Sequence, residues 1–207
     1  MEASDWDRRY AASDLVWSPG PNQWVEELVA PLVPGRALDV AAGEGRNALW
    51  LARRGWDVTA TDFSTIAVQR MRRLASELLS ESFGRLTALL ADATSPLPGP
   101  READLVLFSY LQLPSSEWSR ALRNGIEAAA PGGLILVVGH AARNLTDGSG
   151  GPQDPRVLHD PDDIVDTAQE VAAGQVIIEQ SAIRVRTVTT DDGPRQALDS
   201  VVLLRRT

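Results

Sequence analysis

The sequence predicts an α/β protein built on a doubly wound, mostly parallel β-sheet. Strand-like and helix-like segments alternate along most of the chain, a glycine-rich loop follows the first strand, and the last third carries two long β-rich runs. The 207 residues are 43% hydrophobic and 23% charged, as in ordinary globular proteins. We therefore expect a single domain over residues 1–207, with a helical cover or lid over 1–34 and a core over 35–207.

The first part of the expected sheet begins after a proline–glycine turn. Ala37–Ala41 is a short apolar run that ends in small residues, which indicates a buried strand. Arg46–Arg54 follows a pair of glycines and has apolar residues at helical spacing. Trp56–Thr61 alternates and is rich in residues that favour strands, so it is the second expected strand.

The alternation continues through the middle of the chain. Ser64 is a candidate N-cap for a helix that runs to about Ser80, and Arg85–Ala91 is expected to be the third strand. Ala103–Phe108 is almost continuously apolar, as strands covered on both faces are. A helix is predicted over Ser116–Ala130, closed by a proline and two glycines, and Leu134–Gly139 is the fifth strand.

The last third of the chain has a different character. Asn144–Pro155 is rich in Gly, Pro and Asp and is predicted to be a loop, and Asp160–Ala173 is predicted to be a helix that begins with Asp-Pro. Val176–Thr190 and Gln196–Arg205 are two β-rich runs separated by the turn signal at 191–194. The sheet should therefore end in an antiparallel pair.

Composition excludes several kinds of chemistry. There is no cysteine, and all 20 basic residues are arginine, so thiolate and Schiff-base mechanisms are excluded. The net charge of -8 argues against a nucleic-acid partner, and the two histidines, His140 and His159, are too far apart for a metal motif. The start of the chain lacks a signal-peptide pattern and no apolar run is long enough to span a membrane, so we expect a cytoplasmic protein without a membrane partner.

The strongest local signal is the loop that joins the first strand to the first core helix. Gly43 and Gly45 allow the backbone to turn tightly and approach a ligand, and the start of the helix favours an anionic group. Gly43-x-Gly45-x-x-Ala48 also matches the dinucleotide-binding pattern. A nicotinamide-dependent oxidoreductase therefore remains an alternative, and so does a plain turn between strand and helix.

Four features favour a ligand with an ammonium group and an adenosine. Asp39 lies inside the first strand, four residues before Gly43, where a carboxylate suits an ammonium better than a pyrophosphate. Asp62 ends the second strand, in place to accept the ribose hydroxyls of either ligand. Asp92 follows the third strand and could read an adenine edge. The remaining feature is a tryptophan-rich segment before the first strand, together with the closing antiparallel hairpin.

Together these residues resemble the class I S-adenosylmethionine-dependent methyltransferases. Asp39-x-Ala41-x-Gly43-x-Gly45 matches the family motif Asp/Glu-x-Gly-x-Gly-x-Gly, with Ala41 in place of the first glycine. The loop and the opening segment look more narrowly like a small bacterial branch related to thiopurine and tellurite-resistance methyltransferases. The resemblance implies a Rossmann-like three-layer sandwich whose seven-stranded, mostly parallel sheet has an antiparallel last strand. It also implies S-adenosyl-L-methionine as cofactor, with S-adenosyl-L-homocysteine as product.

The resemblance also implies roles for individual residues. Asp39 and the 41–45 backbone would hold the methionine moiety, Arg46 its carboxylate, Asp62 the ribose, and Phe63 the adenine face. The full set expected to bind the cofactor is Trp17, Asp39, Ala41, Gly43, Gly45, Arg46, Asn47, Asp62, Phe63, Asp92, Ala93 and Ser109.

The expected reaction is methyl transfer by in-line displacement, for which the protein mainly supplies proximity and orientation. Tyr110 and His140 are the candidate catalytic residues and substrate contacts, although Tyr110 could simply line the pocket and His140 could be a hydrogen-bonded loop residue. Trp6 and Tyr10 could form an apolar acceptor slot or simply cover the sheet. The expected partner is a small-molecule acceptor with an O, N, S or metalloid centre and no metal cofactor; a non-catalytic cofactor-binding module of the same fold is the further alternative.

Overall fold

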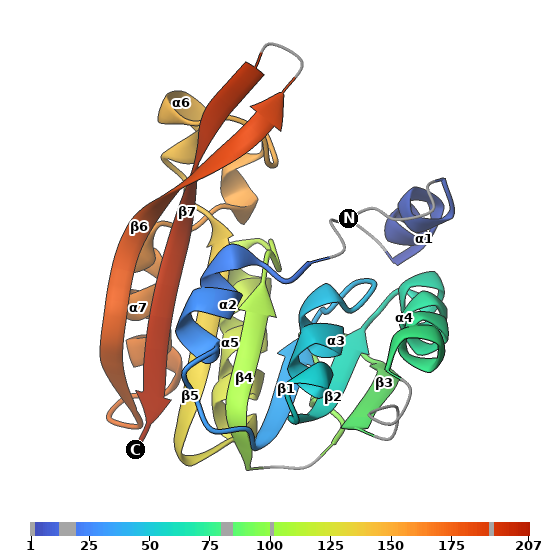
Figure 1. The fold of residues 1–207 in the computed structure, drawn as a ribbon. Coiled ribbons are helices and arrows are strands. Elements are labelled where there is room, and N and C mark those ends of the chain that lie inside the picture. Colours follow the sequence, from blue (N-terminus) through green and yellow to red (C-terminus); the bar gives the residue numbers. More distant parts are fainter. Residues whose placement is uncertain (1–2, 13–19, 80–84, 100–101, 191–192) are drawn as a thin grey trace.

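A computed structural model describes residues 3–12, 20–79, 85–99, 102–190 and 193–207 of the chain (Figure 1). It contains a seven-stranded sheet with the order β3-β2-β1-β4-β5-β7-β6. The strands are β1 Arg36–Val40, β2 Asp57–Asp62, β3 Leu86–Leu90, β4 Ala103–Ser109, β5 Ala129–His140, β6 Val176–Thr190 and β7 Gly193–Arg206. Strand β7 is antiparallel to both of its neighbours and the other neighbouring pairs are parallel, which confirms the predicted doubly wound fold.

Helices cover both faces of the sheet and give three layers (Figure 1). The helices are α1 Ala3–Ala11, α2 Gln23–Val29, α3 Arg46–Arg53, α4 Thr65–Leu78, α5 Ser115–Ala128, α6 Asn144–Asp147 and α7 Pro161–Val171. Helices α2, α3 and α4 pack into one core and α5 and α7 into the other, so the Rossmann-like three-layer arrangement is confirmed.

The apolar sequence of β4 explains why it lies in the middle of the sheet. Leu105 and Leu107 are fully buried in the core beneath α2, α3 and α4, whereas Val106 and Phe108 are fully buried in the core beneath α5 and α7. Successive side chains of a strand point to opposite faces, so a strand with both faces covered needs apolar residues at every position. The helix after β2 begins as predicted, because the Ser64 hydroxyl accepts a hydrogen bond from Ala67 N at 3.1 Å.

Several boundaries differ from the sequence prediction. Strand β5 begins at Ala129, so Pro131, Gly132 and Gly133 lie within it instead of closing the helix, and β7 begins at Gly193 instead of Gln196. The helix expected to reach Ala130 ends at Ala128, because Ala129 is extended and pairs with Ala103 as the start of β5. The segment expected to be entirely loop over 144–155 begins with the short helix α6. Its Asn144 side chain is buried, accepts from Leu198 N at 2.7 Å and donates to Gly150 O at 2.9 Å, which fixes this turn against β7.

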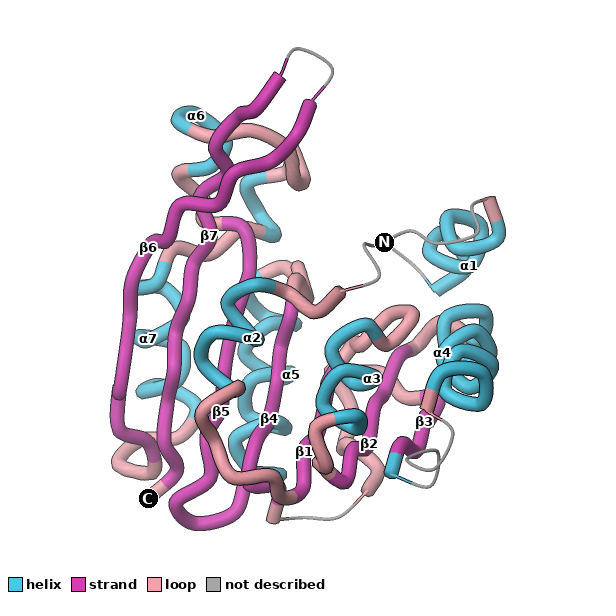
Figure 2. The backbone as a smooth tube through the Cα atoms, viewed as in Figure 1, coloured by secondary structure: helices cyan, strands magenta, loops and turns pink. Residues whose placement is uncertain are grey.

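The carboxyl edge of the sheet is flanked by two projecting parts. Pairing between β5 and β7 ends at His140 and Asp199, so the rest of β7 pairs with β6 alone and the two strands extend past the sheet (Figure 2). Helix α1 lies at the same edge on the other side (Figure 1). None of the helices among the described residues is long and apolar enough to cross a membrane.

Candidate cofactor and acceptor site

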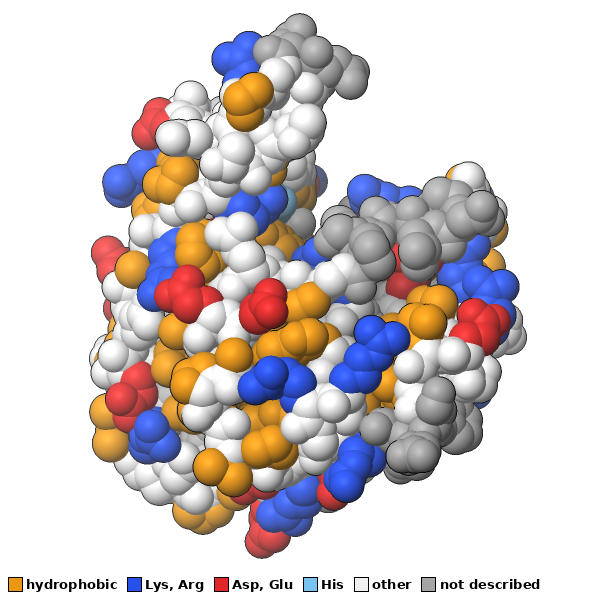
Figure 3. All heavy atoms as spheres, in the orientation of Figure 1, with side chains coloured by type: hydrophobic (Ala, Val, Ile, Leu, Met, Phe, Trp, Pro, Cys, Tyr) orange, Lys and Arg blue, Asp and Glu red, His pale blue; other side chains and the backbone are white. Residues whose placement is uncertain are grey.

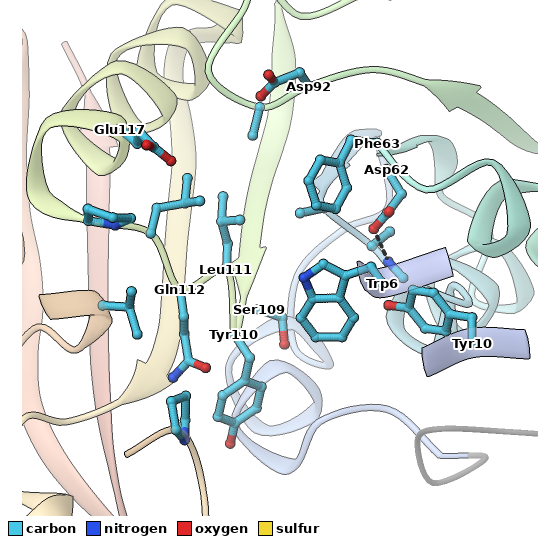
Figure 4. Close-up of a pocket in the computed structure, with 18 of the residues that line it drawn as sticks. Trp6, Tyr10, Asp62, Phe63, Asp92, Ser109, Tyr110, Leu111, Gln112 and Glu117 are labelled. Atoms are coloured by element: carbon cyan, nitrogen blue, oxygen red, sulfur yellow. Dashed lines mark hydrogen bonds between the residues drawn. The ribbon is translucent and has the colours of Figure 1, made fainter. Parts of the chain in front are cut away.

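A cavity of about 570 Å³ lies at the carboxyl ends of β1, β2, β3 and β4. Its wall is formed by α1, the loop after β1, the ends of these strands, the start of α5 and the segment 152–157 (Figure 4). The surface is hollowed between the projecting end of β6 and β7 and helix α1 (Figure 3). Ligands of open α/β sheets bind at this edge, so the cavity is where the fold places a ligand.

The glycine loop has the backbone that close approach to a ligand requires. Ala41, Gly43 and Gly45 all have positive φ angles, of 55°, 59° and 85°. A Cβ atom on Gly45 would lie 2.5 Å from Met71 Cγ, so this position accepts only glycine without displacing α4. Ala41 adopts a conformation that costs a non-glycine residue about 1–2 kcal/mol, at the position where the family motif has its first glycine.

Asp39 is a buried carboxylate whose charge is not compensated by a hydrogen bond. It is 1% exposed, and neither of its oxygens has a hydrogen-bond partner in the part of the chain that the structure describes. Burial raises the pKa of Asp39 to about 7; the nearby Arg46 opposes the rise, Asp62 adds to it, and the Ala48 backbone N–H opposes it weakly. Asp39 does not line the cavity directly but lies in the strand that leads into the glycine loop.

Asp62 links the cavity to the glycine loop. It lines the cavity, and one of its oxygens accepts a hydrogen bond from Gly43 N at 2.8 Å (Figure 4). Its other oxygen accepts from Ser64 N at 2.9 Å. Each oxygen of a carboxylate has a second lone pair, so Asp62 can still accept from a diol. Burial raises the pKa of Asp62, and the two backbone hydrogen bonds oppose that rise.

The adenine end expected from the sequence lies around β3. Asp92, Ala93 and Phe63 all line the cavity. One oxygen of Asp92 accepts from Thr94 N at 2.8 Å and from its hydroxyl at 2.9 Å, an Asx-turn arrangement that leaves the other oxygen for a ligand. Ala93 is buried, whereas Asp92 is exposed at the mouth of the cavity.

Arg46 and Asn47 begin α3 and line the cavity. Burial lowers the pKa of Arg46, an effect opposed by Tyr110 and Asp39. The Arg46 guanidinium carbon lies 5.9 Å from the centre of the Tyr110 ring. The Asn47 side-chain oxygen accepts from Asn22 N at 2.8 Å, so it also holds the start of α2 against α3.

Tyr110 lines the cavity with its ring while its hydroxyl is used elsewhere. The hydroxyl donates to Asp199 at 3.0 Å and accepts from Asn22 Nδ2 at 3.3 Å, and it points away from Asp62 and Phe63 (Figure 4). Burial and the Asp199 carboxylate raise the pKa of Tyr110 well above its usual range, so the hydroxyl is neutral. The geometry suits an orienting wall rather than a proton acceptor.

Asp199 is the fully buried centre of this network. One of its oxygens also accepts from Trp24 Nε1 at 2.9 Å and Arg186 Nε at 2.8 Å, and its other oxygen lies 3.4 Å from His140 Nδ1. Burial lowers the pKa of His140, which is therefore neutral at pH 7. His140 does not line the cavity, but its ring contacts the Tyr110 ring, with the centroids 4.8 Å apart.

Helix α1 supplies the two aromatic residues expected at the acceptor end. Trp6 and Tyr10 both line the cavity, with ring centroids 5.6 Å apart, and Tyr10 is buried (Figure 4). The third aromatic residue proposed in this region, Trp17, lies outside the described residues. Ser109 and Gln112 line the cavity from the end of β4, and Ser109 Oγ and Gln112 Nε2 are buried without a hydrogen-bond partner among the residues described.

Sequence reasoning missed the Asp199 network and the wall formed by 152–157. Asp199 is the lone acidic residue of β7, and every other residue of the run Leu198–Leu204 except Ser200 is apolar. An acidic residue in such a run indicates a buried carboxylate with polar partners, and this signal could have been used. The segment 152–157 lines the cavity but carries no such signal in the sequence.

The comparisons with known proteins agree with this geometry. Residues 37–133 match the family model described as a methyltransferase domain. A protein from work on conversion of a disulfide bond into a thioacetal group during echinomycin biosynthesis is 20% identical, with a TM-score of 0.77 over 100% of this chain and 92% of that one. TehB from Haemophilus influenzae is 16% identical with a TM-score of 0.69, over 100% of this chain and 68% of that one.

Two further proteins are similar to this chain. Magnesium protoporphyrin IX methyltransferase (ChlM) from Synechocystis PCC 6803, solved with bound SAM, is 19% identical with a TM-score of 0.69, over 100% of this chain and 92% of that one. A probable non-canonical nonribosomal peptide synthetase, CymA, from Salinispora arenicola (strain CNS-205), is 34% identical over 113 residues. That match covers 54% of this chain and only 1% of the much longer synthetase.

The chain thus has the fold of S-adenosylmethionine-dependent methyltransferases, and its residues 37–133 match the model of a methyltransferase domain.

Proposed function

We propose that the protein transfers the methyl group of S-adenosyl-L-methionine to a small-molecule acceptor. The observation that carries the proposal is the position of the buried, unpartnered Asp39 carboxylate in the strand beneath a glycine loop that opens on the cavity. A buried carboxylate needs a compensating cation, and the ammonium group of the cofactor is one. The matched methyltransferase domain supports the same cofactor.

The residues around the cavity fit the other groups of this cofactor. Arg46 has the charge to pair with the methionine carboxylate, and Asp62 has free lone pairs for the ribose hydroxyls. Phe63 offers a ring and Asp92 an oxygen on the adenine side. When bound, the cofactor supplies an activated methyl group on a sulfonium, so this chain has to bind, orient and exclude water.

The wall of the cavity combines aromatic and apolar side chains with charged ones, among them Glu117, Asp154 and Arg156. Trp6, Tyr10 and Tyr110 present aromatic rings there, and Val157 and Pro152 lie on the facing segment. Tyr110 orients the acceptor through its ring, because its hydroxyl is held by Asp199. His140 contacts this ring and positions it, and so affects the acceptor only through Tyr110. The net charge of -8 supports a small-molecule acceptor over a nucleic acid.

Thermal shift and calorimetric titration of the full chain test the proposal. Both S-adenosyl-L-methionine and S-adenosyl-L-homocysteine should stabilise the protein, whereas NAD(H) and NADP(H) should not. Replacing Asp62 by Ala should weaken the binding of S-adenosyl-L-homocysteine by about tenfold or more, because the substitution removes an acceptor of charge-assisted hydrogen bonds. Stabilisation by a nicotinamide cofactor alone would favour the oxidoreductase alternative. Tight binding without turnover over a broad acceptor panel would favour a non-catalytic module.

A further inference from the structure

Helix α1 is joined to the body of the protein through Asp7. The Asp7 carboxylate accepts a hydrogen bond from the Ser64 hydroxyl, and Ile66 N makes a longer contact with the same oxygen at 3.4 Å. Ser64 and Ile66 are the N-cap and the second residue of α4. The first backbone N–H groups of a helix are unpaired and favour a negative charge, so Asp7 from one helix stabilises the start of another.

Ser64 connects this contact to the cavity. Its backbone N–H donates to one oxygen of Asp62, whose other oxygen accepts from Gly43 N. Its hydroxyl donates to Asp7 and accepts from Ala67 N, and its carbonyl accepts from Val68 N at 3.1 Å, so all of its hydrogen-bonding groups are used at this junction. Ser64 is fully buried, and it therefore links α1, the ribose-side carboxylate and the glycine loop in one chain of hydrogen bonds.

The same turn of α1 carries the aromatic wall of the cavity. Trp6 precedes Asp7, and Tyr10 follows it by three residues, which places Tyr10 and Asp7 on neighbouring positions of the helix surface. The rings of Trp6 and Tyr10 point into the cavity (Figure 4). Fixing the Asp7 carboxylate on α4 therefore fixes where both rings lie.

We propose that Asp7 and Ser64 form a latch that holds α1 against α4 and positions Trp6 and Tyr10 as a wall of the occupied cavity. The role in ligand retention rests on the proposed function, but the latch itself does not. Asp7 is a positioning residue, because it acts on the ligand through Trp6 and Tyr10. Loss of the latch should leave the part of the cavity formed by the sheet intact, whereas α1, with Trp6 and Tyr10, should become more mobile.

Two measurements on the full chain test the latch, with Asp7→Ala compared with Asp5→Ala. Asp5 is a matched control because it is an acidic residue of the same helix that pairs with Arg8 within α1. The first measurement is amide hydrogen exchange of residues 3–11, which needs no ligand. Asp7→Ala should speed this exchange by about tenfold and Asp5→Ala by much less, because only the first loses a charge-assisted hydrogen bond to α4.

The second measurement is the dissociation rate of S-adenosyl-L-homocysteine. Asp7→Ala should release it about tenfold faster, with the thermal midpoint of the ligand-free protein close to that of Asp5→Ala. In the Ser64→Ala background, Asp7→Ala should have little further effect on either measurement, because the hydrogen bond is already absent.

The outcomes separate the two proposals. Equal exchange in Asp7→Ala and Asp5→Ala, or additive effects of Asp7→Ala and Ser64→Ala, would overturn the latch. Faster exchange in Asp7→Ala with an unchanged dissociation rate would show that α1 is latched but does not retain the ligand, and would overturn the positioning role. If Asp7→Ala speeds exchange but the wild-type protein does not bind S-adenosyl-L-homocysteine at all, the proposed function and the role in ligand retention are overturned. The Asp7–Ser64 latch itself would still be supported.

Discussion

Replacing Asp39 by Asn should make the ligand-free protein more stable and make it bind the cofactor less well. Asp39 is fully buried and has no hydrogen-bond partner among the described residues, and burial raises its pKa to about 7 from an ordinary value of 3.8. A carboxyl with a raised pKa binds its proton more tightly in the folded state. The folded protein therefore loses stability as the pH rises above 3.8, and the loss is complete above about 7.

The size of this loss follows from the shift. Each unit of pKa corresponds to 1.36 kcal/mol, so the rise of about 3 units costs about 4 kcal/mol above pH 7. Between pH 5 and pH 8 the change is about 2.5 kcal/mol. An asparagine amide does not titrate, but its burial without partners costs about 1–3 kcal/mol. Asp39→Asn should therefore stabilise the protein at pH 8 by about 1–3 kcal/mol and have little net effect at pH 5.

Urea unfolding of both proteins at pH 5 and pH 8, followed by circular dichroism without ligand, measures the difference. The effect of the substitution should change between the two pH values by about 2.5 kcal/mol, which corresponds to roughly 5–10 °C in midpoint for a chain of this length. Titration with S-adenosyl-L-homocysteine at pH 8 should show weaker binding by the more stable variant. A substitution effect that is the same at both pH values, or a loss of stability together with binding, would refute the reasoning.

Three further substitutions in the site should lower the free energy of unfolding by different amounts. Gly45→Ala should destabilise the protein by about 1–3 kcal/mol in urea unfolding, because Gly45 has a φ of 85° and a Cβ would meet Met71 at 2.5 Å. Asp199→Asn should lower the free energy of unfolding by about 3 kcal/mol or more, because it leaves Arg186 without its buried counter-charge. It also places an amide, which carries donors of its own, among the groups that donate hydrogen bonds to Asp199. Tyr110→Phe, which removes one of those donors and keeps the ring, should cost only about 1 kcal/mol, and equal losses in the two variants would contradict this account.

The sequence predicted those parts of the fold that local patterns determine. The five parallel strands were found because their apolar runs are interrupted by turns, and the start of α4 was found because Ser64 is a good N-cap. Gly43 and Gly45 marked the loop, since few other residues adopt positive φ there. Most of the residues expected at the cofactor side line one cavity because the carboxyl ends of parallel strands meet at one edge, whereas Asp39 and Gly45 do not line it and Trp17 lies outside the described residues.

The acceptor side could not be predicted in the same way. Asp199 comes to Tyr110 and Trp24 only through the pairing of β7 with β5, across sequence separations of 89 and 175 residues. Asp7 reaches Ser64 across 57 residues, and neither residue carries a pattern that indicates the other. Contacts of this kind depend on the register of strands and the packing of helices, which a single sequence specifies only through the whole fold.

The distribution of unsatisfied polar groups identifies the functional edge independently of any motif. Among the described residues, the buried side chains with an unpartnered polar atom are Asp39, Thr61, Ser109, Gln112, Trp118 and His140. Thr61, Ser109 and His140 stand at or next to the carboxyl ends of β2, β4 and β5, Asp39 is one residue from the end of β1, and Gln112 follows β4. An unmade hydrogen bond costs stability wherever it lies, so a fold selected for stability alone would not collect such groups along one edge of its sheet. Of these groups, Ser109 and Gln112 line the cavity, where a polar ligand would complete their hydrogen bonds, and Asp39 lies in the strand that leads into the glycine loop. The opposite effects predicted for Asp39→Asn on stability and on binding follow from the same reasoning.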